Sequence, residues 1–165
     1  MIPWLSLATI AALLGSGQAD RRVSLVCGVR DGTYDAASDA VTPIKGARLK
    51  VVAVAFNRGT TGRIDPSTIV ITDRDEVLRR GVPTEMLFNP DMTFGLFVEG
   101  SGAERTAILG KPNPETKLFR VSVIGAGLTP SDKGLYALAG TCGLVPIEGE
   151  KALITSFSQR SGTPQ

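Results

Sequence analysis

A series of short segments rich in β-branched residues, separated by turn residues, most constrains the fold of this chain. Residues 22–30 alternate apolar and polar side chains with a period of two, which places one apolar face inward along a strand. Similar segments recur without the helices of a βαβ rhythm. Their expected bounds are 22–30, 47–57, 67–72, 93–99, 104–110, 116–125, 135–145 and 151–157. The pattern predicts an all-β, single-domain antiparallel β-sandwich, immunoglobulin-like or similar, of seven or eight strands, with a β-barrel as the alternative.

One segment departs from the strand period and predicts a short surface helix. Thr72 or Asp73 can cap its N-terminus, and the acidic residues that follow suit the positive end of a helix. Arg79 and Arg80 suit the negative end, and Pro83 stops the helix.

The first 19 residues have the pattern of an export signal. They carry no charged side chain and contain an apolar run over residues 5–14, with small residues at Gly17 and Ala19. Cleavage after Ala19 would start the mature chain at Asp20. The alternatives are a membrane anchor, for which the run is shorter than the ~20 residues that a spanning helix needs, and a buried first strand or helix. The sequence leaves open whether Met1 is the true start.

The domain organisation that follows is a signal peptide at 1–19, a β-sandwich domain at 20–157 and a flexible tail at 158–165. The expected location is the periplasm or the extracellular medium. No further membrane span is expected after signal removal.

The two cysteines, Cys27 and Cys142, are expected to form a disulfide. An exported chain with one even pair most simply joins the two residues, and this bridge would tie the first strand to one of the last. Two free buried thiols and a redox pair are the alternatives. A redox pair would require a close spacing such as C-x-x-C, which the sequence lacks.

A short pattern near the end of the domain bears on the kind of sheet. Asp132, Gly134 and Tyr136 stand at the entry to a late strand, in the sequence Asp-Lys-Gly-Leu-Tyr. This pattern resembles the tyrosine corner of immunoglobulin-like sandwiches, in which the Tyr hydroxyl bonds to nearby backbone. It departs from that pattern because Leu138 stands where those domains have a cysteine. The resemblance implies a sandwich and nothing about function.

Composition removes several classes of catalytic site. The chain has no histidine, so Ser-His-Asp and Cys-His nucleophile systems and most zinc sites are excluded. Its net charge is +2 with scattered charges, which gives no case for binding nucleic acid. Ser131 and Lys133 could form a Ser-Lys pair, although a turn explains both residues. A pair of carboxylates acting as a hydrolase remains a less favoured alternative.

Two acidic clusters could offer oxygen ligands to Ca²⁺, and the sequence leaves both open. One contains Asp73 and Asp75, and helix capping explains it better than a metal; the other contains Asp31, Asp35 and Asp39, which a solvated loop explains. The first cluster lacks the spacing of a calcium loop, and no metal or cofactor is predicted from either.

The sequence therefore favours an exported, non-catalytic β domain that binds an envelope protein or has a structural role there. The contacts are expected in two segments that core packing does not require, residues 31–43 and 73–83, because loops on a rigid scaffold usually carry contacts. Their candidate residues are Asp31, Tyr34, Asp35, Asp73, Asp75, Arg79 and Arg80. The alternative is a carrier of a small apolar ligand, held in a barrel interior lined by Phe94, Phe97 and Phe119. The oligomeric state does not follow from the sequence.

Overall fold

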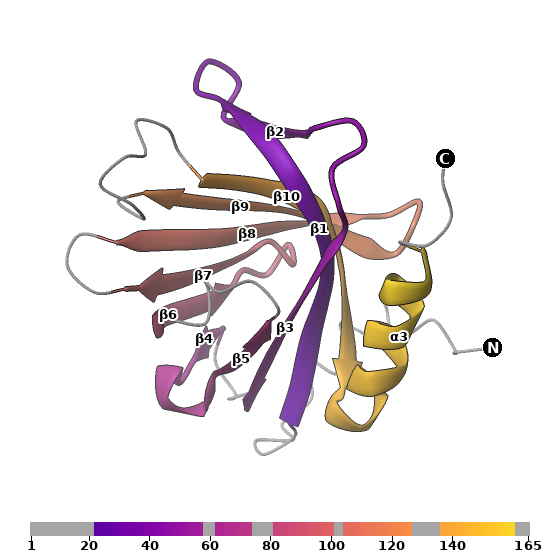
Figure 1. Ribbon diagram of the computed structural model, residues 1–165. Coiled ribbons are helices and arrows are strands. Elements are labelled where there is room, and N and C mark those ends of the chain that lie inside the picture. The colour runs from indigo at the N-terminus through magenta and orange to yellow at the C-terminus, as the bar shows by residue number, and fades with distance from the viewer. Residues whose placement is uncertain (1–21, 58–61, 74–80, 101–103, 127–135, 161–165) are drawn as a thin grey trace.

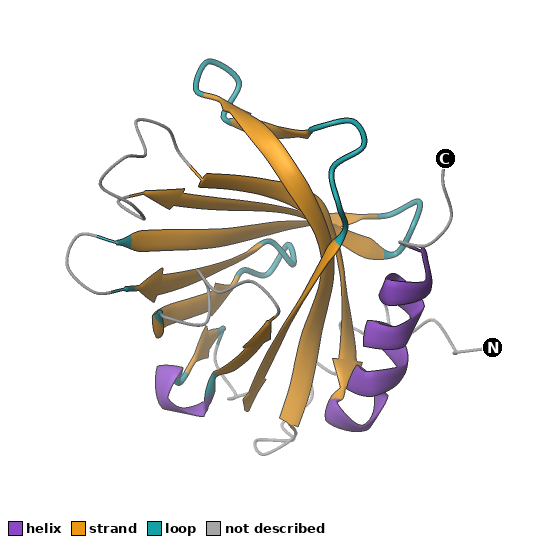
Figure 2. Cartoon of the chain, in the orientation of Figure 1, coloured by secondary structure: helices purple, strands orange, loops and turns teal. Residues whose placement is uncertain are grey.

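The computed structural model describes residues 22–57, 62–73, 81–100, 104–126 and 136–160. Antiparallel strands in this part of the chain form one continuous sheet, which curls into a half-barrel with an α-helix against its outer face (Figures 1 and 2). The mostly β class is therefore confirmed. A sandwich of seven or eight strands is not confirmed, and the barrel alternative fits in part.

The sheet has ten strands in the described residues. They are β1 (Arg22–Asp35), β2 (Ala40–Pro43), β3 (Lys50–Asn57), β4 (Arg63–Ile64), β5 (Val70–Asp73), β6 (Val82–Phe88), β7 (Phe94–Glu99), β8 (Arg105–Asn113), β9 (Leu118–Ala126) and β10 (Tyr136–Pro146). Their order is β4-β6-β7-β8-β9-β10-β1-β3-β5, with β2 paired to β1 outside this path. The helical segments are η1 (Pro66–Thr68), η2 (Ile147–Gly149) and α3 (Glu150–Arg160).

The concave side of the sheet holds the main hydrophobic core. Phenylalanines from β3, β6, β7 and β9 meet there, with neighbouring ring centroids between 5.1 and 6.5 Å apart. They are Phe56, Phe88, Phe94 and Phe119. Edge and tilted contacts of this kind stabilise a core beyond the area they bury. Aromatic side chains therefore fill the middle of the half-barrel.

The predicted disulfide is present between neighbouring strands. Cys27 of β1 lies directly opposite Cys142 of β10, and the bridge between them spans 115 residues of sequence. Both residues are buried on the concave side. The period-two pattern of the first strand therefore placed Cys27 in the core correctly. The expectation that the first strand lies beside one of the last is also confirmed, because β1 pairs with β10.

Helix α3 covers the outer face of β1 and β3, where Leu153 and Phe157 form a second small core with Val26 and its neighbours. Phe157 lies so close to Gly28 that a Cβ atom there would be 2.6 Å from the ring. The strand predicted over residues 151–157 is wrong. Its two buried residues are four apart, which suits one face of a helix rather than one face of a strand. The helix also includes residues 158–160.

Two further expectations about local structure are wrong. The segment 31–43 is a hairpin rather than a loop, because β1 continues through Asp31, Tyr34 and Asp35 and then pairs with β2. A strand also occupies Val82–Phe88, where Pro83 had indicated only a helix stop. Proline is tolerated there because β4 pairs only with the distant end of β6 and the register shifts between Pro83 and Glu85.

Several sequence predictions lie outside the described residues. They concern the signal peptide at 1–19, the helix after β5 with Asp75, Arg79 and Arg80, the pair Ser131 and Lys133, Asp132 and Gly134 of the proposed tyrosine corner, and the last five tail residues. Thr72 and Asp73 are the last two residues of β5, and the helix that they were expected to cap lies outside the described residues. Among the described segments, no helix combines the length and the apolar character needed to cross a bilayer.

Candidate functional site: two interaction surfaces

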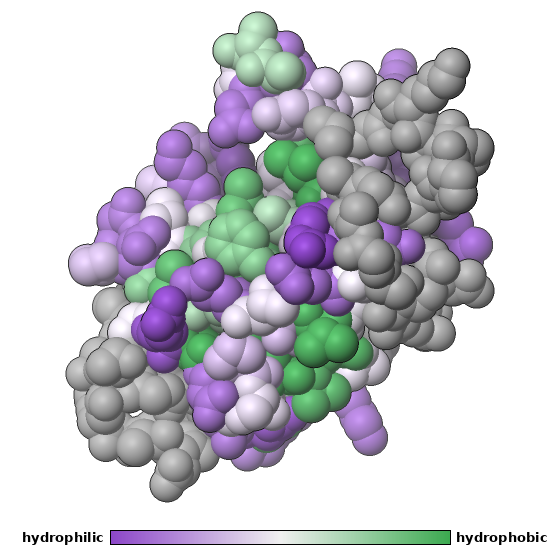
Figure 3. Space-filling view, turned by 90° about the vertical axis from the view of Figure 1, so that its left-hand side faces the viewer, coloured by the Kyte–Doolittle hydropathy of each residue, from purple (hydrophilic) through white to green (hydrophobic). Residues whose placement is uncertain are grey.

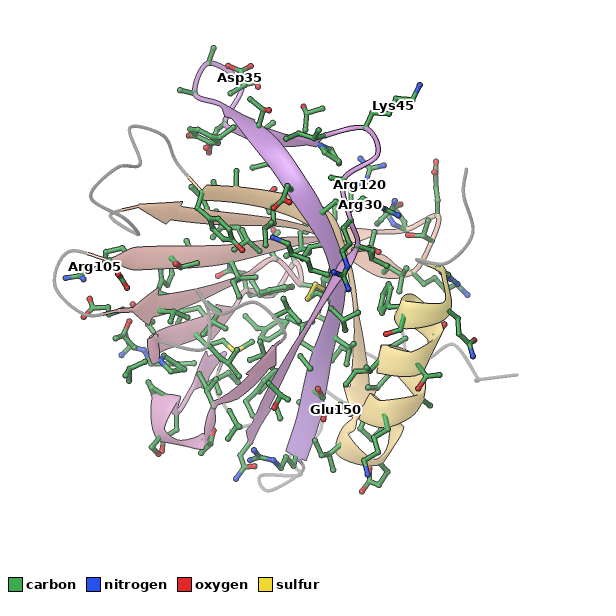
Figure 4. The ribbon with its side chains drawn as sticks, viewed as in Figure 1. Arg30, Asp35, Lys45, Arg105, Arg120 and Glu150 are labelled. Atoms are coloured by element: carbon green, nitrogen blue, oxygen red, sulfur yellow. A yellow bond between two sulfur atoms is a disulfide. The ribbon has the colours of Figure 1, made fainter. Side chains whose placement is uncertain are left out.

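The hairpin formed by β1 and β2 is the first candidate surface. It projects beyond the rest of the sheet, and Asp35 is at its far end (Figures 1 and 4). Residues 35–40 are all exposed. Its two strands are paired from Gly32 opposite Pro43 to Asp35 opposite Ala40. The hairpin is therefore a defined structure whose tip contributes nothing to either hydrophobic core.

Side chains fix the conformation of the hairpin tip. One carboxylate oxygen of Asp35 accepts a hydrogen bond from the Ala37 amide at 3.0 Å, and the other accepts one from the Ser38 hydroxyl at 2.6 Å. The Tyr34 hydroxyl donates to Asp39 at 2.8 Å. Asp39 has a positive φ of 50°, a conformation that aspartate tolerates better than most residues. Local hydrogen bonds thus hold the acidic tip in one shape.

These hydrogen bonds also set the protonation of the tip. The Ser38 hydroxyl, and then the Ala37 amide, hold the pKa of Asp35 below its ordinary value because both favour the carboxylate. The hydrogen bond to Asp39 raises the pKa of Tyr34, since loss of its proton would leave two anions side by side. At neutral pH the tip therefore carries an ionised Asp35 beside a protonated phenol.

The base of the hairpin is tied to the body of the protein. Asp31 accepts a hydrogen bond from the Lys50 ammonium at 2.8 Å, and this ammonium lies 5.9 Å from the ring centroid of Tyr136. The Arg30 guanidinium donates to the carbonyl of Ala47. These contacts join β1 to β3, to β10 and to the segment between β2 and β3. They fix the direction in which the hairpin projects.

The outer face of β6 to β9 is the second candidate surface. Figure 3 shows the molecule from the side toward which β7 and β9 run, so it looks at the ends of these strands, where hydrophobic surface lies between strongly hydrophilic side chains. Phe97 and Leu109 are 40% and 39% exposed although they belong to regular strands. An open hollow of about 560 Å³ has Phe97 in its lining, together with Glu85, Ala107 and Ile124. The described part of helix α3 contacts β1, β3 and β10 rather than this face.

The structure brings together some of the predicted site residues. Tyr34 and Asp35 lie at the tip of the hairpin and Asp31 at its base, whereas Asp73 ends β5 on the far side of β3. Phe94 and Phe119 belong to the core cluster, but Phe97 points away from it. Within the described ranges, no three acidic or cysteine side chains are grouped so as to hold a metal ion.

Sequence reasoning missed the surface around Phe97. The signal was present, because in the sequence Phe-Gly-Leu-Phe-Val-Glu of β7 the period-two pattern turns Phe94, Leu96 and Val98 inward and leaves Phe97 on the other face. A single exposed phenylalanine is ordinary on a protein surface, but Leu109 of the neighbouring strand is exposed on the same face.

The comparisons with known proteins found no match, whether among protein-family models, curated proteins or solved structures.

Proposed function

We propose that this protein is an exported, non-catalytic binding module that contacts a protein of the cell envelope through the hairpin of β1 and β2. The observation that carries the proposal is the hairpin itself, which projects from the sheet and holds its tip by Tyr34, Asp35 and Asp39. Ordered, exposed residues that no core requires are typical of binding elements on a rigid scaffold.

Export is supported by the apolar leader of the sequence and by the disulfide. Structural disulfides persist in oxidising compartments and are rare in the reducing cytosol. The bridge between Cys27 and Cys142 lies in the core, where it joins two central strands. This position is that of a structural bridge, and it supports a location outside the cytoplasm.

The charge at the tip indicates the kind of partner surface. Asp35 and Asp39 are both exposed and acidic, and the carboxylate of Asp35 is held ionised by its hydrogen bonds. A partner with a basic or amide-rich surface would satisfy the remaining acceptor sites of these oxygens. Binding should therefore weaken as salt concentration rises.

The two alternative functions receive less support from the described residues. A carrier of an apolar ligand would hold it inside the half-barrel, but the Phe56, Phe88, Phe94 and Phe119 rings meet there. A hydrolase would need two carboxylates free to act. Asp31, Glu85 and Glu99 each form an ion pair, so these three have structural partners.

Site-specific photo-crosslinking in the producing cell tests the proposal. A photoreactive residue at Ala37, in the tip, should give one discrete adduct, and Asp35→Asn with Asp39→Asn should reduce its yield. The matched control is the same label at Glu115, in the exposed turn between β8 and β9. Equal adducts from both positions, or none from Ala37, would contradict the proposed contact. Turnover of an ester, glycan or peptide by the pure protein, stopped by one acidic substitution, would contradict the non-catalytic role.

A further inference from the structure

The outer face of β7 and β8 has an internal order that its exposure alone does not explain. Three pairs of residues lie directly opposite each other on this face: Glu99 with Arg105, Phe97 with Ala107, and Gly95 with Leu109. Each pair joins an acid to a base or a large side chain to a small one. The large member alternates between the two strands, because Phe97 belongs to β7 and Leu109 to β8.

This order makes the surface complementary to itself. A half-turn about an axis that runs along the strands, midway between β7 and β8, exchanges the positions of the two strands. Glu99 of one copy would then face Arg105 of the other. Phe97 would face the small residue Ala107, and Leu109 would face the position of Gly95, over which Phe97 and Leu109 of the other copy lie. We propose that this face binds a second copy of the same chain, through the packing of two sheets face to face.

The shape of the surface fits this arrangement. The open hollow of about 560 Å³ includes Ala107 and Ile124 in its lining, and Ala107 is the position that Phe97 of the second copy would face. A Cβ atom at Gly95 would lie 3.3 Å from Phe97 and 3.5 Å from Leu109. The absence of a side chain there lets Phe97 and Leu109 of the same chain lie over the glycine, so these two side chains form the apolar surface that a second copy would meet. Facing sheets pack about 10 Å apart, a distance that such large and small pairs fill.

The charges favour a second copy over a partner of one charge. The surface carries two ion pairs, Arg105 with Glu99 at 3.2 Å and Arg63 with Glu85 at 3.0 Å. Acidic and basic groups are therefore balanced around Phe97, whereas Lys111 and Arg120, which lie opposite each other further along the same face, are both basic. A strongly acidic or basic partner would meet like charge at half of these groups, whereas a second copy rotated by a half-turn meets the opposite charge at Glu99 and Arg105.

Sedimentation velocity on two single variants and their mixture tests the proposed dimer. The wild-type protein should dimerise with a dissociation constant in the micromolar range, about 1–100 µM. Glu99→Arg should weaken its own dimer at least about 10-fold, because the new arginine would face Arg105 of the second copy. Arg105→Glu should weaken its own dimer to the same extent, because the new glutamate would face Glu99 of the second copy. An equimolar mixture should recover a 1:1 complex, because both facing pairs are then Arg with Glu.

Controls separate dimer formation from folding. The double variant Glu99→Arg with Arg105→Glu keeps the pair within each chain and the facing pairs, so it should dimerise like the wild type. Phe97→Ser removes the apolar contact and should abolish the dimer while leaving the strand signal in circular dichroism unchanged. A wild-type protein that stays monomeric to about 1 mM overturns the proposal. So does a mixture of the two single variants that stays monomeric, or a dimer that survives in Phe97→Ser.

Discussion

Reduction of the disulfide gives the sharpest test of how the sheet is held together. The bridge joins residues 115 apart in sequence, so reducing it frees a long loop in the unfolded chain. The chain-entropy model values the closure of a loop of this size at about 4.8 kcal/mol at room temperature, and measured values usually fall below the model. We therefore expect reduction to lower the free energy of unfolding by about 3–5 kcal/mol.

The reduced protein should remain folded, which makes this measurement possible. Cys27 and Cys142 lie within nine consecutive register pairs between β1 and β10, whose backbone hydrogen bonds do not depend on the bridge. Urea unfolding, followed by circular dichroism of the strands with and without reductant, gives the two free energies. The m-value should rise on reduction, because the unfolded chain without its cross-link exposes more surface.

The control is the variant Cys27→Ala with Cys142→Ala, whose unfolding should not respond to reductant. Thiol titration of the unfolded, unreduced wild type should find no free sulfhydryl. Two reactive thiols would contradict the bridge itself. A difference below about 1 kcal/mol between the oxidised and reduced wild type would refute the reasoning from loop closure.

Two further predictions concern helix α3 and the hairpin tip. Phe157→Ala should lower the free energy of unfolding by about 3 kcal/mol, because Phe157 packs against the sheet and is only 6% exposed. The control is Gln159→Ala, at an exposed position of the same helix, and equal stabilities of the two variants would refute the packing. Tyr34 should titrate in ultraviolet absorbance above its ordinary pKa, and Asp39→Asn should lower that pKa toward the ordinary value. Because the folded pKa is raised, this contribution to stability is complete below the ordinary value of about 10 and is lost as pH rises through the folded pKa. A tyrosine titration that Tyr34→Phe leaves unchanged would contradict this assignment.

Most central strands could be predicted from the sequence because one side of each is buried in a single core. In β1, β3 and β9 the side chains that belong to the main core recur at every second residue, and this period depends only on local backbone geometry. The disulfide could be predicted for a related reason. A chain that is expected to be exported and has two distant cysteines offers one pairing, and the strand pattern already turned Cys27 inward.

The errors lie where two signals compete within a few residues. Ile154 and Thr155 favour a strand by propensity. Glu150 in the first turn, and Leu153 four residues before Phe157, favour a helix. The packing of Leu153 and Phe157 on the sheet decided the outcome. In the hairpin, Gly32 indicated a break in the first strand. Its missing side chain is instead required by contact, since a Cβ atom there would lie 2.6 Å from Val41 in β2.

The candidate surfaces could be predicted only in part, because each depends on which residues face one another. The sequence selected Tyr34 and Asp35, but the hydrogen bonds that fix the tip follow from the four-residue turn between β1 and β2. Phe97 lies opposite Ala107 only in one register of β7 on β8, and a shift of one residue would turn the phenylalanine into the core. Register is a property of strand pairs, so patterns within single strands do not contain it.

The two outer faces of the sheet follow one physical rule. Where an aromatic ring lies flat on a strand, the residue beneath it must be small, and Gly28 meets this need under Phe157 of helix α3. On the other face Gly95 lies beneath Phe97 and Leu109 in the same way. These two side chains come from the sheet itself, and they remain 40% and 39% exposed. The first face is completed by an element of the same chain. The second has the same construction without such an element among the described residues, and this is the face on which we propose that a second copy packs.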